Sequence, residues 1–225
     1  MSKKYIYLSH FLDINTPTYG NRDKFTINEN SLIAKGDTAN SFSICFSTNH
    51  MGTHIDLPKH FFDDGKTLND FDPGYWIYNK VALIDVPKDK GELIIPADLS
   101  EIEIDKNCEI ILIRTCFEKF RSQNIYWEAN PGIDPSVADY LRDRLPRIRT
   151  IGFDFISLTS FKHRKLGKEA HRAFLGGSHD FITVIEDMHL VDLPESPIQL
   201  IVSPLLINGI DAAPVSVLAL STTEK

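Results

Sequence analysis

The stretch His50-Met51-Gly52-Thr53-His54-Ile55-Asp56-Leu57-Pro58-Lys59-His60 gathers three of the chain's eight histidines and one aspartate. These four side chains occupy even positions, so an extended chain would send them to one face and the residues between them toward a core. A straight strand would hold His50 and His54 about 13 Å apart, at roughly 3.3 Å per residue. Ligands of one ion must lie much closer, because each bond to zinc is about 2 Å long. We therefore expect a bend at Gly52, whose backbone can adopt angles closed to other residues.

A helical turn would also bring His50 and His54 together, but Asp56 would then point away and Pro58 would break the helix. Imidazole and carboxylate groups are the expected ligands of zinc and also suit manganese. The competing interpretation is that these histidines are surface or hydrogen-bonded residues in a loop. That interpretation would suit a lone histidine, but three histidines and an aspartate within eleven residues disfavour it. A structural zinc site is disfavoured because such sites usually recruit cysteine. The segment predicts a divalent-metal site.

The rest of the chain predicts one sheet-rich domain over residues 1–225. Its 225 residues are 42% hydrophobic and 24% charged, as in an ordinary globular protein, and contain no repeat or long linker. Short apolar runs rich in β-branched residues predict strands. These runs are Tyr5–Leu8, Ser41–Phe46, Val81–Val86, Glu109–Arg114, Thr150–Phe155, Ile182–Ile185, Gln199–Ile207 and Val215–Leu220.

Two segments predict helices. The first begins at Asp134-Pro135, a capping carboxylate before a proline, and ends at Pro146. The second covers roughly 166–175 and stops at Gly176-Gly177, a doublet suited to a left-handed cap. Many strands with two helices predict an α/β (α+β) fold dominated by sheet.

Composition excludes several classes of protein. The net charge is −7 and the densest basic stretch, 162–165, is short, so we expect no nucleic-acid partner. No apolar run approaches the roughly 18 residues of a membrane span. Three cysteines without paired spacing (Cys45, Cys108 and Cys116) favour a reducing, cytoplasmic location. The apolar flanks of Cys45 predict burial, and no Gly-x-Ser-x-Gly motif is present, so a cysteine or serine nucleophile is disfavoured.

Segment 50–60 resembles the His-x-Gly-Thr-His-x-Asp-x-Pro-x-His signature of the cyclase family at every fixed position. That family includes bacterial kynurenine formamidases and related metal-dependent amide hydrolases. The resemblance extends over most of the chain, through Leu8-Ser9, Thr16–Tyr19, Gly152-Phe153-Asp154 with Ser157, Ala170-His171-Arg172, Ile185-Glu186-Asp187 and 205–217. It implies a β-rich, swivelling β/β/α barrel-like single domain that forms a homodimer or a higher homo-oligomer.

The resemblance also implies the roles of individual residues. Two divalent ions per subunit, Zn²⁺ or Mn²⁺, would be held by His50 and His54 on one side and His171 on the other, with Asp56 and Glu186 shared. His60 would be the general acid/base, and Tyr19 would line the pocket for a small-molecule substrate. The spacing from His171 to Glu186 exceeds that of the formamidases, so His179 is a rival ligand. Ser216 replaces a common arginine, which leaves formylkynurenine open as substrate.

We therefore expect an arylformamidase-like hydrolase of a small amide or a cyclic amide or lactone. A bound divalent ion lowers the pKa of its water from about 16 to about 7 and so supplies hydroxide, while His60 takes the proton and returns it to the leaving group. The alternative is a non-catalytic metal-binding or small-molecule-binding protein on the same fold. The presence of His60, which is not needed as a ligand, counts against it. His10 could approach the pocket beside Tyr19, and we expect His189 at the surface or behind Glu186.

Overall fold

The computed structural model describes residues 2–177 and 180–223. Its main element is a mixed nine-stranded sheet with the order β5-β12-β13-β4-β11-β10-β8-β6, and β1 pairs with β13 beside this path. The strands are β1 Ser2–Tyr7, β4 His54–Asp56, β5 Ile77–Tyr78, β6 Val81–Asp85, β8 Ile110–Arg114, β10 Thr150–Phe153, β11 Thr183–Glu186, β12 Gln199–Pro204 and β13 Ala212–Thr223. Two small sheets pair β2 (Phe25–Ser31) with β3 (Ser41–Phe46), and β7 (Leu93–Ile94) with β9 (Gly132–Ile133).

The helices are short. They are α1 Pro96–Leu99, α2 Ile125–Glu128, α3 Ser136–Arg144 and α4 Arg164–Leu175, with 3-10 turns at Tyr19–Asn21, Ile33–Lys35, Pro58–His60, Leu68–Asp70, Pro73–Trp76 and Phe117–Phe120. Both predicted helices are confirmed, and the Asp134 carboxylate accepts a hydrogen bond from the backbone N–H of Ser136. At the end of α4, Gly176 is extended and Gly177 takes the positive φ, 93°. None of the described helices combines the length and apolar character needed to cross a bilayer.

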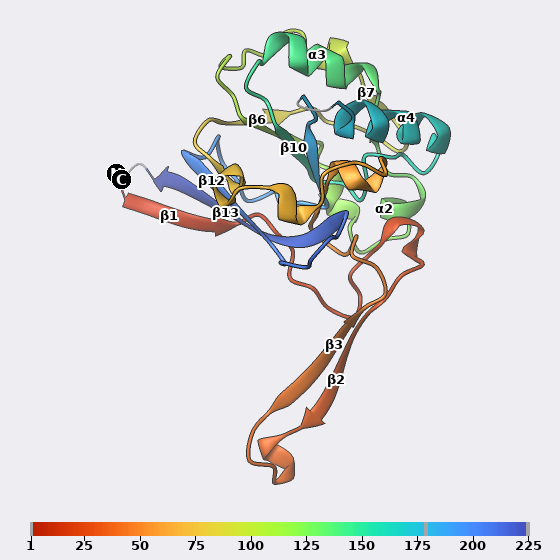
Figure 1. Ribbon diagram of the computed structural model, residues 1–225, viewed down its shortest axis with the longest axis vertical. Coiled ribbons are helices and arrows are strands. Elements are labelled where there is room, and N and C mark those ends of the chain that lie inside the picture. The colour runs from red at the N-terminus through yellow and green to blue at the C-terminus, as the bar shows by residue number, and fades with distance from the viewer. Residues whose placement is uncertain (1, 178–179, 224–225) are drawn as a thin grey trace.

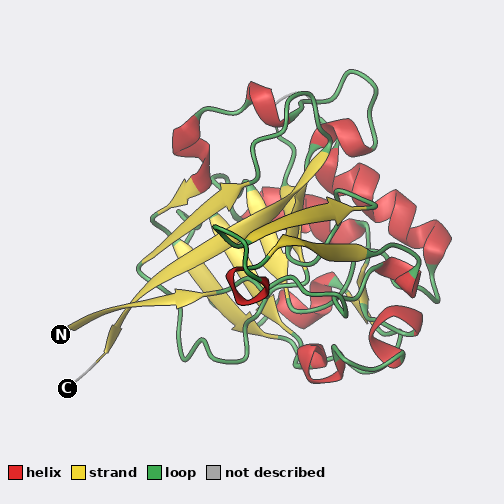
Figure 2. Cartoon of the chain, turned by 90° about the horizontal axis from the view of Figure 1, so that it is seen from below, coloured by secondary structure: helices red, strands yellow, loops and turns green. Residues whose placement is uncertain are grey.

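The parallel strands β8, β10 and β11 are buried on both faces, which explains their continuous apolar runs, whereas β6 lies parallel to β8 at the sheet edge and is only partly buried. Ile111 and Ile113 of β8 pack toward α3 and α4, in one core cluster with Phe174. Ile110 and Leu112 point to the opposite face and share a second cluster with residues of β12 and β13. Strand β8 therefore packs against β12 and β13, which lie toward the other end of the same sheet, so the sheet is strongly curved (Figures 1 and 2). The predicted α/β class with a β-rich, barrel-like sheet is confirmed.

Strands β2 and β3 form a hairpin that projects from the body (Figure 1). The side chains of Ile27, Phe42 and Ile44 on this hairpin are exposed. The prediction that Cys45 is buried is wrong, because its apolar run forms a strand of this hairpin, which projects away from the described core. All eight predicted strands exist, whereas β2, β5, β7 and β9 had no pattern that the sequence analysis recognised.

Candidate metal centre

Gly52 bends the chain as its position in the sequence predicted. Its φ is +60°, and a Cβ at this position would clash with the side chain of Leu12. The bend brings the rings of His50 and His54 to a centroid separation of 5.1 Å. After it, the chain enters β4, where Ile55 is fully buried in the core while the even-numbered side chains face a cavity.

Sheet register places the next carboxylate. Strand β4 lies between β11 and β13 and is antiparallel to both. In this register Glu186 of β11 is the direct partner of His54, so their side chains meet on the same face. The two residues are 132 positions apart in the chain (186 − 54), and only this strand pairing joins them.

Helix α4 supplies His171. The helix can approach the loop that follows β10 because Gly167 has no side chain, and a Cβ there would clash with Thr159. His171 lies one turn after Gly167 and is 4% exposed. Its Nε2 lies 3.5 Å from Asp56 Oδ2 and 3.6 Å from Glu186 Oε1.

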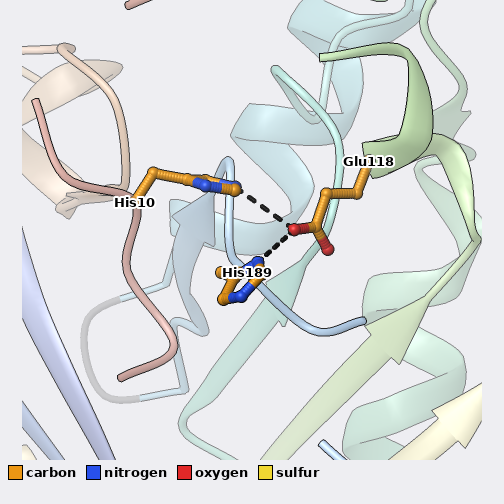
Figure 3. A group of neighbouring side chains, drawn as sticks. All are labelled: His10, Glu118 and His189. Atoms are coloured by element: carbon orange, nitrogen blue, oxygen red, sulfur yellow. Dashed lines mark hydrogen bonds and ion pairs between the residues drawn. The ribbon is translucent and has the colours of Figure 1, made fainter. Parts of the chain in front are cut away.

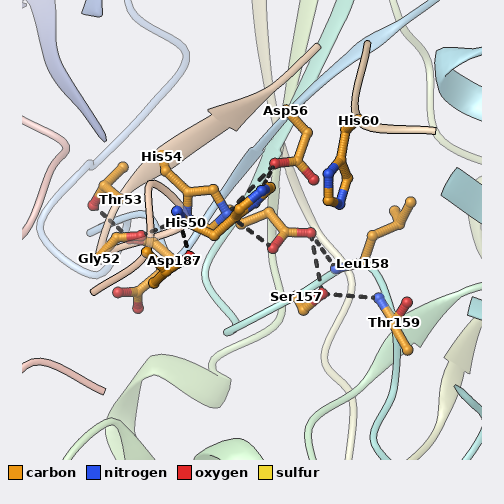
Figure 4. Close-up of polar contacts among 12 residues, drawn as sticks. His50, Gly52, Thr53, His54, Asp56, His60, Ser157, Leu158, Thr159 and Asp187 are labelled. Carbon is orange, nitrogen blue, oxygen red and sulfur yellow. Dashed lines mark hydrogen bonds and ion pairs between the residues drawn. The ribbon is translucent and has the colours of Figure 1, made fainter. Parts of the chain in front are cut away.

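Asp56 and Glu186 therefore lie between His171 on one side and the pair His50 and His54 on the other. Figure 4 shows the Asp56 carboxylate directed toward the His50 and His54 rings. On one side, Asp56 Oδ1 is 3.0 Å from His50 Nδ1 and 3.6 Å from His54 Nε2. Glu186 Oε2 is 3.3 Å from the same nitrogen of His54. The other oxygens of the two carboxylates face His171. The arrangement offers two neighbouring positions for a cation, one beside His50 and His54 and one beside His171. The carboxylates of Asp56 and Glu186 each reach both positions.

The ring nitrogens are oriented to accept a cation. His54 Nδ1 lies 2.8 Å from the Gly52 carbonyl and His171 Nδ1 lies 2.9 Å from the Gly167 carbonyl. A ring N–H donating to each carbonyl leaves the Nε2 lone pair facing the carboxylates. Charged groups lie near the buried His54 Nε2 and Asp56 Oδ1, but among the described residues neither atom has a partner in hydrogen-bond geometry. Buried polar atoms without partners are costly, and a divalent cation would satisfy both. The residues present therefore fit a metal.

The two candidate cation positions differ in how freely the Glu186 carboxylate oxygen beside each one could bind an ion. Glu186 Oε1 already accepts hydrogen bonds from the backbone N–H of Leu158 (2.7 Å) and the hydroxyl of Ser157 (3.2 Å), whereas among the described residues Oε2 has only the His54 ring beside it, at 3.3 Å. The position beside His50 and His54 thus has the freer carboxylate oxygen.

The electrostatics of the centre also favour a cation. Burial alone would lower the pKa of His50, but the charge of Asp56 and the nearby Asp211 carboxylate raise it to about 10. Burial likewise opposes protonation of His171, yet hydrogen bonds to Asp56 and Glu186 raise its pKa to about 9. Protons therefore balance the carboxylates when no ion is bound, and a metal would displace them.

Asp211 is the site residue that the sequence analysis missed. Its Oδ2 lies 2.8 Å from Nδ1 of His60 and 3.4 Å from Nε2 of His50, and its Oδ1 accepts a hydrogen bond from the Asn49 amide. Pairing of β13 with β4 brings it there, through a bond from the Leu57 N–H to the Asp211 carbonyl. The local sequence offered only an acidic residue before an apolar strand, a weak signal.

The centre opens into a cavity of about 380 Å³. Tyr19, the predicted substrate-binding residue, lines it with Phe61, and its buried hydroxyl makes no hydrogen bond within the part of the chain that the structure describes. Three cationic side chains, Arg22, Arg164 and Lys168, lie in the same wall. His10 does not line this cavity, and the rival ligand His179 lies outside the described residues.

Residues 6–159 match the model of the Cyclase family, described as "Putative cyclase". The chain is 30% identical to a kynurenine formamidase from Sphingopyxis alaskensis, over 92% of this chain and 93% of that protein. Isatin hydrolase A from Labrenzia aggregata has a similar structure, with a TM-score of 0.82 at 23% identity over 98% of this chain and 94% of that one.

A predicted metal-dependent hydrolase from Bacillus stearothermophilus also shares the fold, with a TM-score of 0.77 at 21% identity over 99% and 100% of the two chains. The family match ends before His171 and Glu186, so the place of these two residues in the centre rests on the geometry above.

Proposed function

Because the chain belongs to the cyclase family and is a hydrolase of carbon–nitrogen bonds other than peptide bonds, we propose that it is a metal-dependent, arylformamidase-like amidase. The observation that carries the proposal is the buried pair of carboxylates shared between histidine Nε2 atoms, where His54 Nε2 and Asp56 Oδ1 make no hydrogen bond to any described residue. Such a set of donors suits Zn²⁺ or Mn²⁺.

His50 and His54 would hold one ion and His171 the second, with Asp56 and Glu186 shared. When bound, the ions supply Lewis acidity that activates water and polarises the substrate's carbonyl. The chain itself moves the proton. His60 lies at the cavity with Nδ1 against Asp211, so its Nε2 is the atom free to take a proton from the attacking water. It returns that proton to the nitrogen as the carbon–nitrogen bond breaks.

The cavity wall indicates the class of substrate. Arg22, Arg164 and Lys168 place up to three positive charges around an enclosure that also contains two aromatic rings. Phe61 stacks on His171 at a centroid distance of 4.8 Å, which leaves an apolar surface directly beside the centre. A small aryl amide that carries a carboxylate fits this combination of ring and charge.

The test is a panel assay on chelator-treated protein reconstituted with Zn²⁺ or Mn²⁺. The panel contains N-formylkynurenine, a neutral aryl formamide and isatin. We expect hydrolysis only with metal present, and Arg164→Ala should raise KM for the carboxylate-bearing substrate more than for the neutral one. Arg147→Ala, at an exposed position outside the cavity, is the matched control. Metal binding without hydrolysis of any panel member would favour the alternative, a non-catalytic binding protein. The His60–Asp211 pair counts against this alternative, because a protein that only binds metal does not need it.

The exposed apolar side chains of the β2–β3 hairpin support a homodimer or higher homo-oligomer, in which a second copy covers them. Light scattering should give a mass above the 25.5 kDa of one chain, and Ile44→Asp should lower it. A wild-type mass of one chain would contradict this assembly. Three free cysteines, two of them exposed, support a reducing cytoplasmic setting.

A further inference from the structure

A second cluster of ligand-type side chains lies outside the cavity (Figure 3). His10 follows β1, Glu118 lies in the 3-10 turn 117–120, and His189 follows β11. One potential ligand atom from each lies within 4.8 Å of the others. Glu118 Oε1 is 3.6 Å from His10 Nε2 and also contacts His189 Nδ1. Three segments far apart in the sequence therefore converge on one carboxylate oxygen.

The oxygens of Glu118 have separate roles. Oε2 accepts hydrogen bonds from the backbone N–H groups of Leu190 (2.9 Å) and Val191 (3.1 Å). These bonds fix the carboxylate and turn Oε1 toward the two imidazoles (Figure 3). The side chain is 9% exposed, so its charge needs a nearby counterion.

The two imidazoles are oriented like metal ligands. His189 Nε2 lies 3.1 Å from the Asp192 carboxylate, while its Nδ1 faces Glu118. A histidine held through its far nitrogen by a carboxylate is the usual support for a metal-bound imidazole. The buried His10 Nε2 makes no hydrogen bond to any residue in the described ranges 2–177 and 180–223.

We propose that His10, Glu118 and His189 bind a divalent transition ion of the zinc class at a site distinct from the candidate metal centre. Tetrahedral zinc with bonds of about 2.05 Å places its ligand atoms roughly 3.3 Å apart, close to the separation of His10 Nε2 and Glu118 Oε1. The His189 ring contacts the same carboxylate oxygen and is partly exposed, so solvent lies on one side of it, where the ring can turn to admit an ion. Water would complete the coordination.

The site lies directly behind the strands that build the metal centre. The backbone N–H of His10 donates to the Thr53 hydroxyl, and that hydroxyl donates to the Asp187 carbonyl. Thr53 precedes His54, and Asp187 follows Glu186. An ion held by His10 and His189 would therefore cross-link the N-terminal segment to the ends of β4 and β11. Its role would be to brace these strands rather than to contact substrate.

The test is a Co²⁺ titration of the full-length, chelator-treated protein, followed by visible absorption and by elemental analysis. A His50→Ala, Asp56→Ala double variant removes at least one ligand from each ligand group of the metal centre and so isolates the second site. We expect this variant to bind one Co²⁺ per chain, and the added His189→Ala change to abolish that binding. In the otherwise wild-type protein, His189→Ala should remove one ion per chain. His163→Ala, at an exposed histidine before α4, should remove none.

Glu118→Gln provides a second route, because its amide oxygen can still accept the Leu190 and Val191 bonds while the charge is lost. It should weaken Co²⁺ binding at least tenfold, with a circular dichroism spectrum like that of the wild type. Folded His189→Ala and Glu118→Gln proteins that bind as many ions as the wild type, equally tightly, would overturn the proposal and leave a hydrogen-bonded ion pair. Because the double variant lacks the metal centre, failure of the proposed function would not alter this result.

Discussion

Replacing Asp211 tests whether His60 is positioned for proton transfer. The Asp211 carboxylate lies 2.8 Å from His60 Nδ1 and is 32% exposed. A hydrogen bond to a charged group contributes about 1.5–3 kcal/mol, against about 0.5–1.5 kcal/mol for a neutral one. Asp211→Asn retains a neutral acceptor and should therefore lose roughly 1 kcal/mol, and partial exposure favours the lower value. Since about 1.36 kcal/mol corresponds to a tenfold change in rate, kcat should fall roughly fivefold.

Asp211→Ala removes the acceptor completely and should lower kcat by roughly 10- to 150-fold, for a loss of about 1.5–3 kcal/mol. The assay is steady-state hydrolysis of the best panel substrate, with metal content measured on the same samples because Asp211 also contacts His50. KM and metal content should stay within about twofold of the wild type. Asp143→Asn, at an exposed position of α3, is the control. Full kcat in both Asp211 variants would refute the positioning of His60 by this carboxylate.

Three further changes probe the centre and its support. His60→Ala should lower kcat by about 10²- to 10⁴-fold with normal metal content, because general acid–base catalysis contributes that much. Arg121→Met leaves the fully buried Asp187 without its cationic partner and should lower the free energy of unfolding by about 3–5 kcal/mol. The melting temperature should therefore fall by roughly 6–20 °C. Gly52→Ala forces a side chain against Leu12 at a positive φ, so elemental analysis should show metal loss.

Matched variants separate these effects from nonspecific damage. Gly36→Ala also places a side chain at positive φ, but in open space, and should leave metal content unchanged. Arg147→Met removes an exposed arginine and should leave the melting temperature within about 2 °C, because such surface changes usually cost under about 0.5 kcal/mol. Full activity of His60→Ala would remove its acid/base role. An unshifted melting temperature for Arg121→Met, or normal metal content for Gly52→Ala, would contradict the structural account.

The bend at Gly52 and the fold class were predictable because their signals are local. Alternation of side chains along 50–60 and the φ freedom of glycine belong to the segment itself. Apolar runs likewise identified strands such as β8 and β10, whose burial on both faces leaves a continuous pattern. The resemblance to a known family then supplied His171 and Glu186, which no local pattern could have joined to His54.

Other features depend on pairing between distant segments. Asp211 reaches His60 only because β13 pairs with β4, and His189 meets His10 only through the ends of β11 and β1. Burial of Cys45 was mispredicted for a related reason, since an apolar run does not reveal whether other segments pack against it. Register and long-range packing determine these contacts, and both lie beyond the reach of periodicity in a single sequence.

Chelation and reconstitution test the central claim most directly. Hydrolysis of the best panel substrate and metal content are measured before chelation, after removal of all metal, and after addition of Zn²⁺ or Mn²⁺. The account predicts that activity disappears with the metal and returns with it, and that Glu186→Gln binds less metal at the centre and stays inactive. A metal-free protein that remains fully active would contradict the account.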